Sequence, residues 1–582
     1  MKQLEGLCWS SFYAGTFVQL LNHDEGAPVV HAEAGEYGQW FGPSTEGRDP
    51  EKRSCDFLIV WTMPEHISPS FAKVLQFELV SQDALKREVD DFSEMVLQMG
   101  SRAPLLFLPM WVVPTWHRGL GALDMALERG IGKSLLEMNA RLCANLAGAK
   151  GIFPLNTARW IACAGTRAFQ PKLWHMTKNP FGNDVYLEAL RDIKAALAGS
   201  VGKSKKLVVV DLDETLWGGL VGEVGWQGLR LGGHDYVGEA LQDFQRALKG
   251  LKNRGVLLAV ASKNDEPAAL EAIQRHPEMV LKLEDFVAWR INWKDKADNI
   301  IELAKELNLG LDAVVFIDDS EHERQRVKNA LPDVYVPDWP AEKTQFASHL
   351  LNLRCFDSLQ VSAEDAARTK MYQEETIRSQ ARSGHISTEE WLAASDLQVT
   401  VRRLEEVDLP RVAQLINKTN QMNLATRRIS ELDLKRWCEN SGAAVWSIRA
   451  ADRFGDSGLC GVLSAVVDAD AEDAVRIVDY VLSCRVIGRK IEDVMLHVAV
   501  EWAKSLHKAK VLATHVPSER NGVCLDFWMN SGCAWHKESN TFVWPVEQPH
   551  LLPHYIQVCR GMPDGQSETS QQSAEGIRIH GA

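Results

Sequence analysis

The chain has 582 residues, a length that suggests three or four domains. Hydrophobic residues make up 45% of the chain and charged residues 24%, as is ordinary for a globular protein that folds in water. The net charge of −14 disfavours nucleic acid and anionic membranes as partners, and does not speak against a local basic pocket for phosphate.

Targeting signals and cysteine usage lead to the same expectation about location. The first residues lack the basic and long apolar regions of a signal peptide, and no apolar run approaches the ~18 residues that a membrane span requires. The eleven cysteines are scattered, without a CxxC pair or the spacing of zinc ligands. We therefore expect reduced thiols and a cytoplasmic location, with no membrane partner.

The first part of the chain, residues 1–203, alternates short apolar runs with helical patterns. The runs at 56–61 and 103–113 are typical of buried strands, and the patterns at 77–99 and 134–148 are typical of helices. This alternation predicts an α/β layer fold.

The second part, residues 204–361, follows a linker rich in Gly, Ser and Lys. Helical patterns separate three near-continuous apolar runs, which cover residues 207–210, 256–261 and 313–317. Runs of this kind are buried on both faces of a sheet. We therefore predict a central parallel sheet with helices on both faces, in a multidomain α/β protein.

The third part begins after a charged helical connector at 362–396. Residues 397–548 carry both strand-like and helical runs and form its core. Its strand-like runs lie at 443–448, 458–467 and 511–516, with one helix at 491–508. The polar residues 549–582, and above all those after Met562, are expected to form a disordered tail.

Each apolar run of the second part ends in reactive side chains. Asp211 and Asp213 follow the first run, Ser262 follows the second, and Asp318 and Asp319 follow the third. In open α/β sheets ligands bind beyond the carboxyl ends of the strands, so these segments should converge on one crevice. A lone DxD at a strand end is often only a turn or a helix cap, but three strand ends together favour chemistry.

This set of side chains suits phosphoryl transfer. Mg²⁺ needs hard oxygen ligands, which Asp211, Asp318 and the backbone carbonyl of Asp213 can supply. Asp211 can also attack phosphorus, and Asp213 can protonate the leaving oxygen and later activate water or another acceptor. Ser262 can bind phosphoryl oxygens together with a lysine of the segment 292–296, which contains both Lys294 and Lys296.

These residues resemble the signature of the haloacid-dehalogenase (HAD) superfamily, in which DxDx[TV] is followed by Ser or Thr, then Lys, then an acidic pair. Finer features over about 204–546 resemble the FkbH-like branch, subclass IIIC. They are the segments 211–219, 221–223, 262–265, 276–279, 292–296, 316–319, 417–428 and 482–489.

The resemblance implies a role for each matching residue. Asp211 would be the nucleophile and a metal ligand, and Asp213 the acid/base. The family match also indicates Lys296, and not Lys294, as the phosphate-binding lysine. The expected phosphate-binding residues are Ser262, Lys296 and Thr215, and the expected Mg²⁺ ligands are Asp211, Asp213, Asp318 and Asp319.

The resemblance also implies a reaction. FkbH-like proteins act in polyketide and related biosynthesis, where they capture the glyceryl unit of 1,3-bisphosphoglycerate with loss of phosphate. The unit ends as a thioester on an acyl carrier protein. The expected partners are therefore a small phosphorylated three-carbon acid and the phosphopantetheine arm of a carrier protein.

Two positions depart from the family pattern. Many glyceryl-loading members carry Cys between the two aspartates, where this chain has Leu212, which cannot form a thioester. Either the thiol of the carrier arm attacks directly, or the chain does something else. Glu214 stands where Asn is more usual, and a second carboxylate there could alter metal or substrate binding.

The C-terminal part resembles a GNAT-type acyltransferase fold. The resemblance implies an α+β domain that binds pyrophosphate at a loop opening a helix. Lys490 stands where that loop usually has Gly or Ala. A catalytically silent domain and a carrier-docking domain are both open alternatives. The candidate phosphopantetheine-binding residues are Asn417, Arg427, Arg428, Arg485, Gly488 and Arg489.

The N-terminal part faintly resembles an SGNH-hydrolase-like domain. Ser10 and Ser11 are at best a remnant of its nucleophile loop, and no DxxH motif occurs near residue 180. A non-catalytic interaction domain is therefore favoured.

Three functions follow from the sequence. The first is an FkbH-like enzyme that forms an acyl-carrier-protein thioester. The second is a HAD-type phosphatase of a small molecule or a phosphoprotein, and the third is a scaffold that binds a carrier protein without turnover. Intact Asp211 and Asp213 argue against the scaffold, and Leu212 mildly favours the phosphatase.

Overall fold

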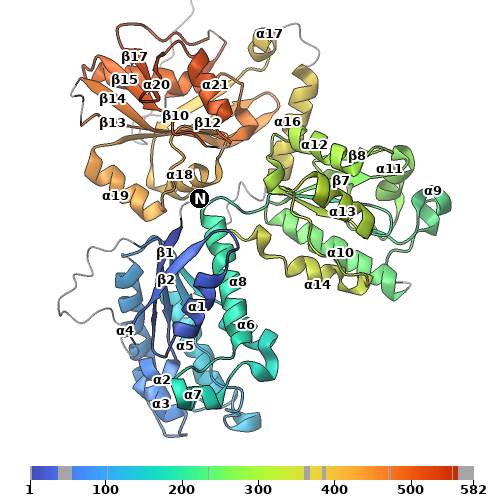
Figure 1. The fold of residues 1–582 in the computed structure, drawn as a ribbon, viewed down its shortest axis with the longest axis vertical. Helices are drawn as coiled ribbons and strands as arrows, with labels where there is room; N and C mark the ends of the chain where they lie inside the picture. Colours follow the sequence, from blue (N-terminus) through green and yellow to red (C-terminus); the bar gives the residue numbers. More distant parts are fainter. Residues whose placement is uncertain are drawn as a thin grey trace, which may run out of the picture. The chain divides into compact units, whose positions relative to one another are not determined.

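The computed structural model describes residues 3–36, 55–100, 102–233, 235–359, 368–382, 388–469, 471, 473–518, 520–553 and 555–560. The chain divides into two compact units. Figure 1 labels their helices and strands. The first unit comprises Met1–Thr376, Leu409–Thr419 and Thr426–Ser441, and the second comprises Ile377–Asp408, Asn420–Ala425 and Gly442–Ala582.

The N-terminal part of the first unit is built on a parallel sheet with strand order β2-β1-β3-β4-β5. Its strands are β1 (Leu4–Ser10), β2 (Val30–Ala34), β3 (Phe57–Trp61), β4 (Leu106–Pro109) and β5 (Ile152–Leu155). The helices around it are α1 (Gly15–His23), α2 (Pro64–Ile67), α3 (Pro69–Val74), α4 (Gln82–Gly100), α5 (Ile131–Asn145), α6 (Thr157–Ala164), α7 (Pro171–Thr177) and α8 (Asn183–Ser200).

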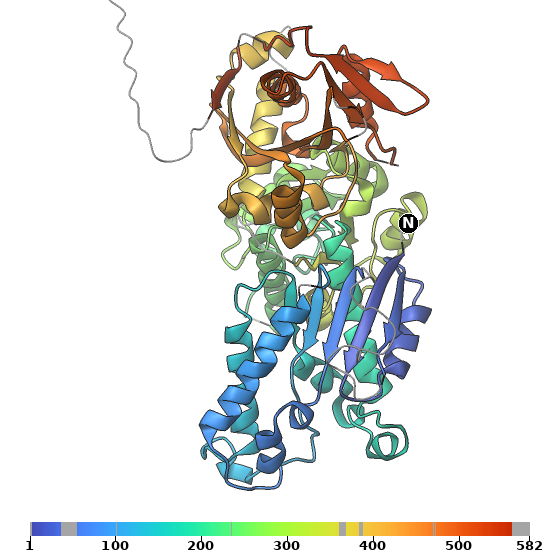
Figure 2. The ribbon, with the colours of Figure 1, turned by 90° about the vertical axis from the view of Figure 1, so that its left-hand side faces the viewer.

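Helices cover both faces of this sheet, as Figure 2 shows. Alternate residues of β3 enter two separate cores: Phe57 and Ile59 join one, while Leu58 and Val60 join the other. A strand that is buried on both faces must be apolar at every position, as the run at 56–61 predicts. The α/β layer fold expected for this part is confirmed.

The second part of the first unit contains a four-stranded parallel sheet with strand order β8-β7-β6-β9. Its strands are β6 (Leu207–Val210), β7 (Leu257–Ser262), β8 (Ala288–Ile291) and β9 (Val314–Ile317). The accompanying helices are α9 (Val221–Val224), α10 (Tyr236–Asn253), α11 (Glu266–Arg275), α12 (Lys296–Glu306), α13 (Glu321–Ala330) and α14 (Phe346–Leu351).

The strand order of this sheet creates a topological switch point. The chain runs outward from β6 to β7 and β8, and then returns to place β9 on the other side of β6. Helices α10, α11 and α14 pack against one face, and α12 and α13 against the other. This is the predicted central parallel sheet covered on both faces, and its crevice should lie between the ends of β6 and β9.

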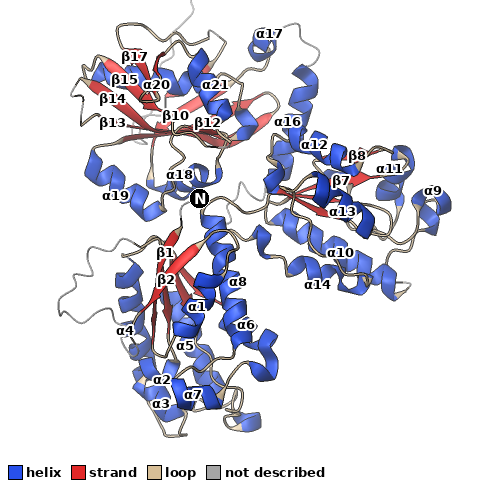
Figure 3. Cartoon of the chain, in the orientation of Figure 1, coloured by secondary structure: helices blue, strands red, loops and turns tan. Residues whose placement is uncertain are grey.

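The second unit is built on one large, mostly antiparallel sheet, drawn in red in Figure 3, with order β16-β17-β15-β14-β13-β12-β10-β18 and with β11 paired to β14. The strands are β10 (Gln398–Arg403), β11 (Met422–Asn423), β12 (Ala444–Asp452), β13 (Gly455–Val467), β14 (Ala474–Leu482), β15 (Lys510–Thr514), β16 (Ala534–His536), β17 (Thr541–Pro545) and β18 (Gln557–Arg560). The helices α17 (Thr388–Ala393), α20 (Ile491–Ser505) and α21 (Gly522–Asn530) belong to the same unit.

The domain boundaries expected from the sequence differ from the boundaries of the two units in the structure. Within the expected connector 362–396 the structure has α16 (Arg368–Arg382), which passes from the first unit into the second, and α17. Two helices from the expected domain 397–548 group with the first unit instead: α18 (Leu409–Lys418) and α19 (Glu431–Ser441). Spatial grouping of this kind depends on packing, which the order of elements along the chain does not reveal.

The expected disordered tail, 549–582, begins too early. Strand β18 pairs in parallel with β10, and Ile556 is buried in the core of the second unit. An edge strand needs few apolar residues, because one Ile in contact with a core can anchor it. The polar sequence of this segment therefore led to the wrong expectation of disorder. Residues 561–582 lie outside the described part of the chain. Among the residues that are described, no helix is both long and apolar enough to cross a membrane.

Candidate active site

The candidate site lies at the carboxyl ends of β6, β7 and β9. Asp211 directly follows β6 and Asp318 directly follows β9, and these two strands are neighbours in the sheet. Their carboxylates therefore meet at the switch point, although 107 positions separate the residues along the chain. This is where the parallel-sheet rule predicts a ligand.

Three carboxylates form a cluster there. One oxygen each from Asp211, Asp318 and Asp319 lies within 4.8 Å of the other two. Asp211 and Asp318 are buried, and Oδ1 of Asp211 has no hydrogen-bond partner within the described chain. A buried carboxylate oxygen without a donor is costly unless a cation or a reacting group completes it.

Lys296 is the counter-charge inside the cluster. Its Nζ lies 3.0 Å from Oδ2 of Asp211 and 2.6 Å from Oδ2 of Asp318. The lysine is the first residue of α12, whose N-cap Asp295 accepts a hydrogen bond from the Ala297 amide. The rival Lys294 is exposed, and its Nζ lies 3.4 Å from Glu302.

The electrostatics of the cluster are unbalanced. Burial lowers the pKa of Lys296, but Asp211 and Asp318 outweigh this and raise it overall. Burial and then the neighbouring Asp211 carboxylate raise the pKa of Asp318 to about 7 and also raise the pKa of Asp319. When all three carboxylates are ionised, one ammonium leaves two negative charges, which is the charge that a divalent cation balances.

Asp213 lies beside the cluster and has different partners. Its Oδ1 accepts hydrogen bonds from the Trp217 indole at 2.7 Å and the Val221 amide at 3.2 Å. Its Oδ2 accepts one from the Asn264 amide group at 2.8 Å. Burial raises the pKa of Asp213 despite these donors, which suits an acid that must hold a proton. Its side chain is not one of the three clustered carboxylates, so any share in metal binding falls to its backbone carbonyl.

Thr215, an expected phosphate-binding residue, is bonded to another residue of the site. Its hydroxyl is fully buried, donates to Oδ1 of Asp319 at 3.1 Å and accepts from the Asp319 amide at 3.1 Å. A hydroxyl committed in this way has no free donor for phosphate. In this arrangement Thr215 positions Asp319, and its expected contact with phosphate stays a prediction.

Neither of the two positions that depart from the family pattern supplies a ligand to the cluster. Leu212 is fully buried in a core that also contains residues of α10. Glu214 adopts a left-handed backbone conformation with φ 57°, accepts from the Gly219 amide at 2.5 Å and pairs with Lys343. The extra carboxylate of Glu214 thus braces the loop after β6 and is not among the clustered ligands.

Two residues near the site were missed by the sequence reasoning. Asn264 follows Ser262, the buried residue that ends β7, and it holds Asp213. Arg324 on α13 donates from Nη1 to the carbonyl oxygens of Asp318 at 2.8 Å and Asp319 at 2.6 Å. The motif 262–265 offered a signal for Asn264, but nothing in the local sequence distinguishes Arg324 from its charged neighbours.

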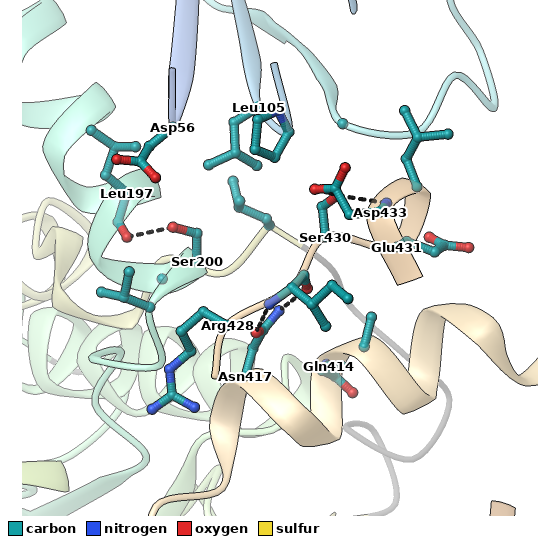
Figure 4. A pocket seen from close by; sticks show the side chains of 18 of the residues that line it. Asp56, Leu105, Leu197, Ser200, Gln414, Asn417, Arg428, Ser430, Glu431 and Asp433 are labelled. Carbon is teal, nitrogen blue, oxygen red and sulfur yellow. Dashed lines mark hydrogen bonds between the residues drawn. The ribbon is translucent and has the colours of Figure 1, made fainter. Parts of the chain in front are cut away.

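Two of the candidate phosphopantetheine-binding residues line a cavity in the first unit. The cavity has a volume of about 200 Å³, and Figure 4 shows Asn417 and Arg428 along it together with Gln414 from α18. The side chain of Asn417 is bound to the backbone of Ile429 by two hydrogen bonds, of 2.8 and 3.0 Å. Arg427 does not line this cavity and packs at 4.4 Å over the Trp437 ring.

The other three candidates belong to the second unit, where protein groups engage them. The Gly488 amide donates to the Glu492 carboxylate at 2.6 Å, so an acidic side chain occupies the place expected for pyrophosphate. Arg489 is buried, with Nη1 3.2 Å from Oδ2 of Asp452, and Arg485 donates to the Ser483 hydroxyl at 3.3 Å. These contacts give the loop a structural role, and its expected binding of phosphopantetheine stays a prediction.

The N-terminal sheet brings one serine to a histidine. Oγ of Ser11, just after β1, lies 3.0 Å from Nδ1 of His66 and also accepts from the Met63 amide at 2.8 Å. The Met63 bond ties this serine to the turn after β3. In the described part of the chain no carboxylate is bonded to the His66 ring.

Comparison with known proteins gives partial likenesses. No family model and no curated protein matches the chain. The N-terminal part of the protein BF1531 from Bacteroides fragilis, which contains a phosphatase domain and was solved in complex with Mg, is 26% identical. That match has a TM-score of 0.55 and covers 62% of this chain and 95% of the other.

Two acetyltransferase structures match a smaller share. A variant of the spermidine N-acetyltransferase SpeG from Vibrio cholerae is 14% identical with a TM-score of 0.19, over 24% of this chain and 81% of the other. A GNAT-family acetyltransferase from Staphylococcus aureus Mu50 is 11% identical with a TM-score of 0.21, over 25% of this chain and 99% of the other.

Proposed function

We propose that the chain is a magnesium-dependent phosphoryl-transfer enzyme of the HAD type, with Asp211 as its nucleophile. The observation that carries the proposal is the meeting of Asp211, Asp318 and Asp319 within 4.8 Å, where the buried ammonium of Lys296 pairs with the first two. The likeness to a phosphatase domain complexed with Mg supports it.

The residues present fit a magnesium ion. Carboxylates are the hard ligands that Mg²⁺ prefers, and the unpartnered Oδ1 of Asp211 is a buried acceptor of the right kind. Asp211, Asp318 and Asp319 would hold the ion, with the backbone carbonyl of Asp213. When bound, the ion neutralises charge that develops on the phosphoryl oxygens.

The chain's own groups divide the remaining chemistry between them. Asp211 attacks phosphorus in line with the leaving oxygen, which receives a proton from Asp213. Lys296 and Ser262 stabilise the phosphoryl oxygens during transfer. Asp213 then removes a proton from the incoming acceptor, whose attack releases the phosphoryl group from Asp211.

In its finer form the proposal names the substrate and the acceptor of the acyl group. The sequence resemblance supports 1,3-bisphosphoglycerate as the donor of a glyceryl unit, which ends on the phosphopantetheine thiol of an acyl carrier protein. On 1,3-bisphosphoglycerate, Asp211 would take the 3-phosphoryl group and pass it to water. The carrier thiol would attack the carbonyl carbon of the acyl phosphate, whose C–O bond breaks to release inorganic phosphate. Leu212 supports direct attack by that thiol, because no protein thiol lies between the two aspartates.

A second candidate is a phosphatase that releases phosphate to water from a small molecule or a phosphoprotein. The same leucine supports it, because the cysteine of many glyceryl-loading relatives is missing. A scaffold without turnover is the least favoured, since the acid cluster, Lys296 and Asp213 are all in place.

Mass spectrometry of a holo carrier protein separates these functions. The carrier is incubated with the enzyme, Mg²⁺ and 1,3-bisphosphoglycerate. A glyceryl mass shift that disappears in Asp211→Asn and persists in the exposed control Asp298→Asn supports thioester formation. Phosphate release without a shift supports the phosphatase, and the absence of both in every variant overturns the proposed enzyme.

A further inference from the structure

A second cavity opens beside the acid cluster. It has a volume of about 400 Å³ and lies between α13 and the segment 336–341. Asp319 belongs both to the lining of this cavity and to the carboxylate cluster, so the cavity begins where the cluster ends. Its position makes it the natural space for the part of a substrate that does not react.

Arg324 is the anchored cation of this cavity. Its Nη1 is fixed by the two hydrogen bonds to the carbonyl oxygens of Asp318 and Asp319. A guanidinium has five N–H donors in a rigid fork, so these bonds hold the group in place and leave further donors on Nη2 and Nε. A fixed arginine at the rim of a reaction centre is well suited to bind a carboxylate or a phosphate.

A second cation adds donors to the cavity wall. Lys328 lies four residues after Arg324 on α13, which places both cations on one face of the helix. Trp339 also lines the cavity and contributes an aromatic ring to its wall. The lining also includes the carboxylates of Glu321 and Asp338, which can accept hydrogen bonds from hydroxyl groups.

We propose that this cavity binds the distal end of the substrate, and that this end is a small hydroxylated group with a second anionic charge. Arg324 and Lys328 contact the anion, while the phosphoryl group that reacts lies at Asp211. The inference rests on the proposed function and deepens it, because it defines which phosphorylated compounds the site prefers. A carboxylate and a phosphate present the same chemistry to these two cations.

Two acyl phosphates that differ at the distal end test this selectivity. 1,3-Bisphosphoglycerate carries hydroxyl and phosphate groups there, and acetyl phosphate carries only a methyl group. In Lys328→Gln and Arg324→Gln the ratio of kcat/KM for the first substrate to that for the second should fall about tenfold or more, as expected for a lost charged hydrogen bond. The exposed Lys305→Gln on α12 is the matched control and should keep the wild-type ratio.

The ratio separates recognition from a structural role, because a variant that merely disturbs the acid cluster slows both substrates alike. Calorimetry with 3-phosphoglycerate gives a readout without turnover, and its Kd should rise about tenfold in Lys328→Gln. If both variants kept the wild-type ratio and the wild-type Kd, the inference would be overturned. Phosphate release by the same proteins would still support the proposed function. If wild-type protein releases no phosphate from either compound, the proposed function fails, and the calorimetry still decides whether the cavity binds the anion.

Discussion

The ammonium of Lys296 lies 2.6 Å from Oδ2 of Asp318, and both side chains are almost completely buried. The same Nζ is 3.0 Å from Asp211, so one cation joins carboxylates that follow two adjacent strands. Partners at such a depth depend strongly on each other, because removal of one leaves an uncompensated charge away from water.

Replacement of Lys296 by Met should therefore affect both activity and stability. Phosphate release should fall at least about a hundredfold, because a phosphoryl-stabilising donor is lost. Unfolding should become easier by about 3–5 kcal/mol, the usual cost of a broken buried ion pair. Phosphate assays and thermal unfolding, with and without Mg²⁺, measure the two effects.

The exposed Lys294→Met is the control for this change, since its partner Glu302 is also exposed. It should retain activity within about twofold, as surface ion pairs contribute little. Equal losses in the two variants would contradict the assignment of Lys296.

Replacement of Leu212 by Cys should not restore a reactive thiol. The side chain at this position is fully buried in the hydrophobic core. Burial in an apolar environment raises the pKa of a thiol and makes it unreactive. Iodoacetamide should therefore label Cys143, which is exposed, far faster than the new thiol, as peptide mass spectrometry can show. Rapid labelling of position 212 in folded protein would contradict this geometry.

Asp285 should make stability depend on pH. Burial raises the pKa of its carboxyl, but hydrogen bonds from Lys252 and the Lys282 amide outweigh burial and lower it overall. A group whose pKa is lower in the folded state stabilises above its unfolded pKa of about 4, and this contribution is lost as the pH falls through the folded value.

Asp285→Asn should therefore lower the free energy of unfolding by about 1–3 kcal/mol at pH 7, and by less at pH 3. Thermal unfolding at the two pH values measures the difference. Asp243→Asn, which breaks an exposed pair with Arg246, should change little at either pH. A deficit of Asp285→Asn that grows towards pH 3 would show that the sign is wrong.

The central sheet and most of its site could be predicted because the relevant signals are local. Residues 207–210 are apolar at every position, which marks a strand buried on both faces, and Asp211 comes directly after them. Ligands of parallel sheets bind at the carboxyl ends of the strands, so Asp318 could be predicted to lie beside Asp211 without any knowledge of packing. Lys296 needed the family resemblance, because Lys294 fits the spacing equally well.

Side-chain direction could not be predicted in the same way. Thr215 is bonded to Asp319, and Glu492 accepts a hydrogen bond from the Gly488 amide in the loop expected to hold pyrophosphate. Both contacts depend on rotamers and on neighbours brought close by folding. Arg324 was missed for the same reason, since its value comes from two carbonyl oxygens that no sequence pattern identifies.

Ser11 should behave as a structural serine. Its Oγ is the acceptor for the Met63 amide, and Ser11 itself is buried. A fluorophosphonate probe should therefore label folded protein no more than heat-unfolded protein. Ser11→Ala should destabilise the protein by about 1–3 kcal/mol, because the Met63 amide loses its partner. Specific labelling of Ser11 that disappears in His66→Gln would instead indicate a hydrolase site.

Because of strand β18, the second unit should tolerate truncation after this strand and should be destabilised by truncation before it. The strand pairs with β10 from Gln398 to Val401, and Ile556 adds a side chain to the core. Its loss would expose the edge of β10 and remove about 1.5–3 kcal/mol of apolar burial.

A chain that ends at residue 560 should therefore unfold within about 1 °C of the full chain, since it keeps both contributions. A chain that ends at residue 548 should unfold several degrees lower and scatter more light on heating, because an unpaired strand edge promotes association. Differential scanning fluorimetry with light scattering measures both. Equal unfolding temperatures for the two truncations would mean that the pairing of β18 with β10 contributes nothing to stability.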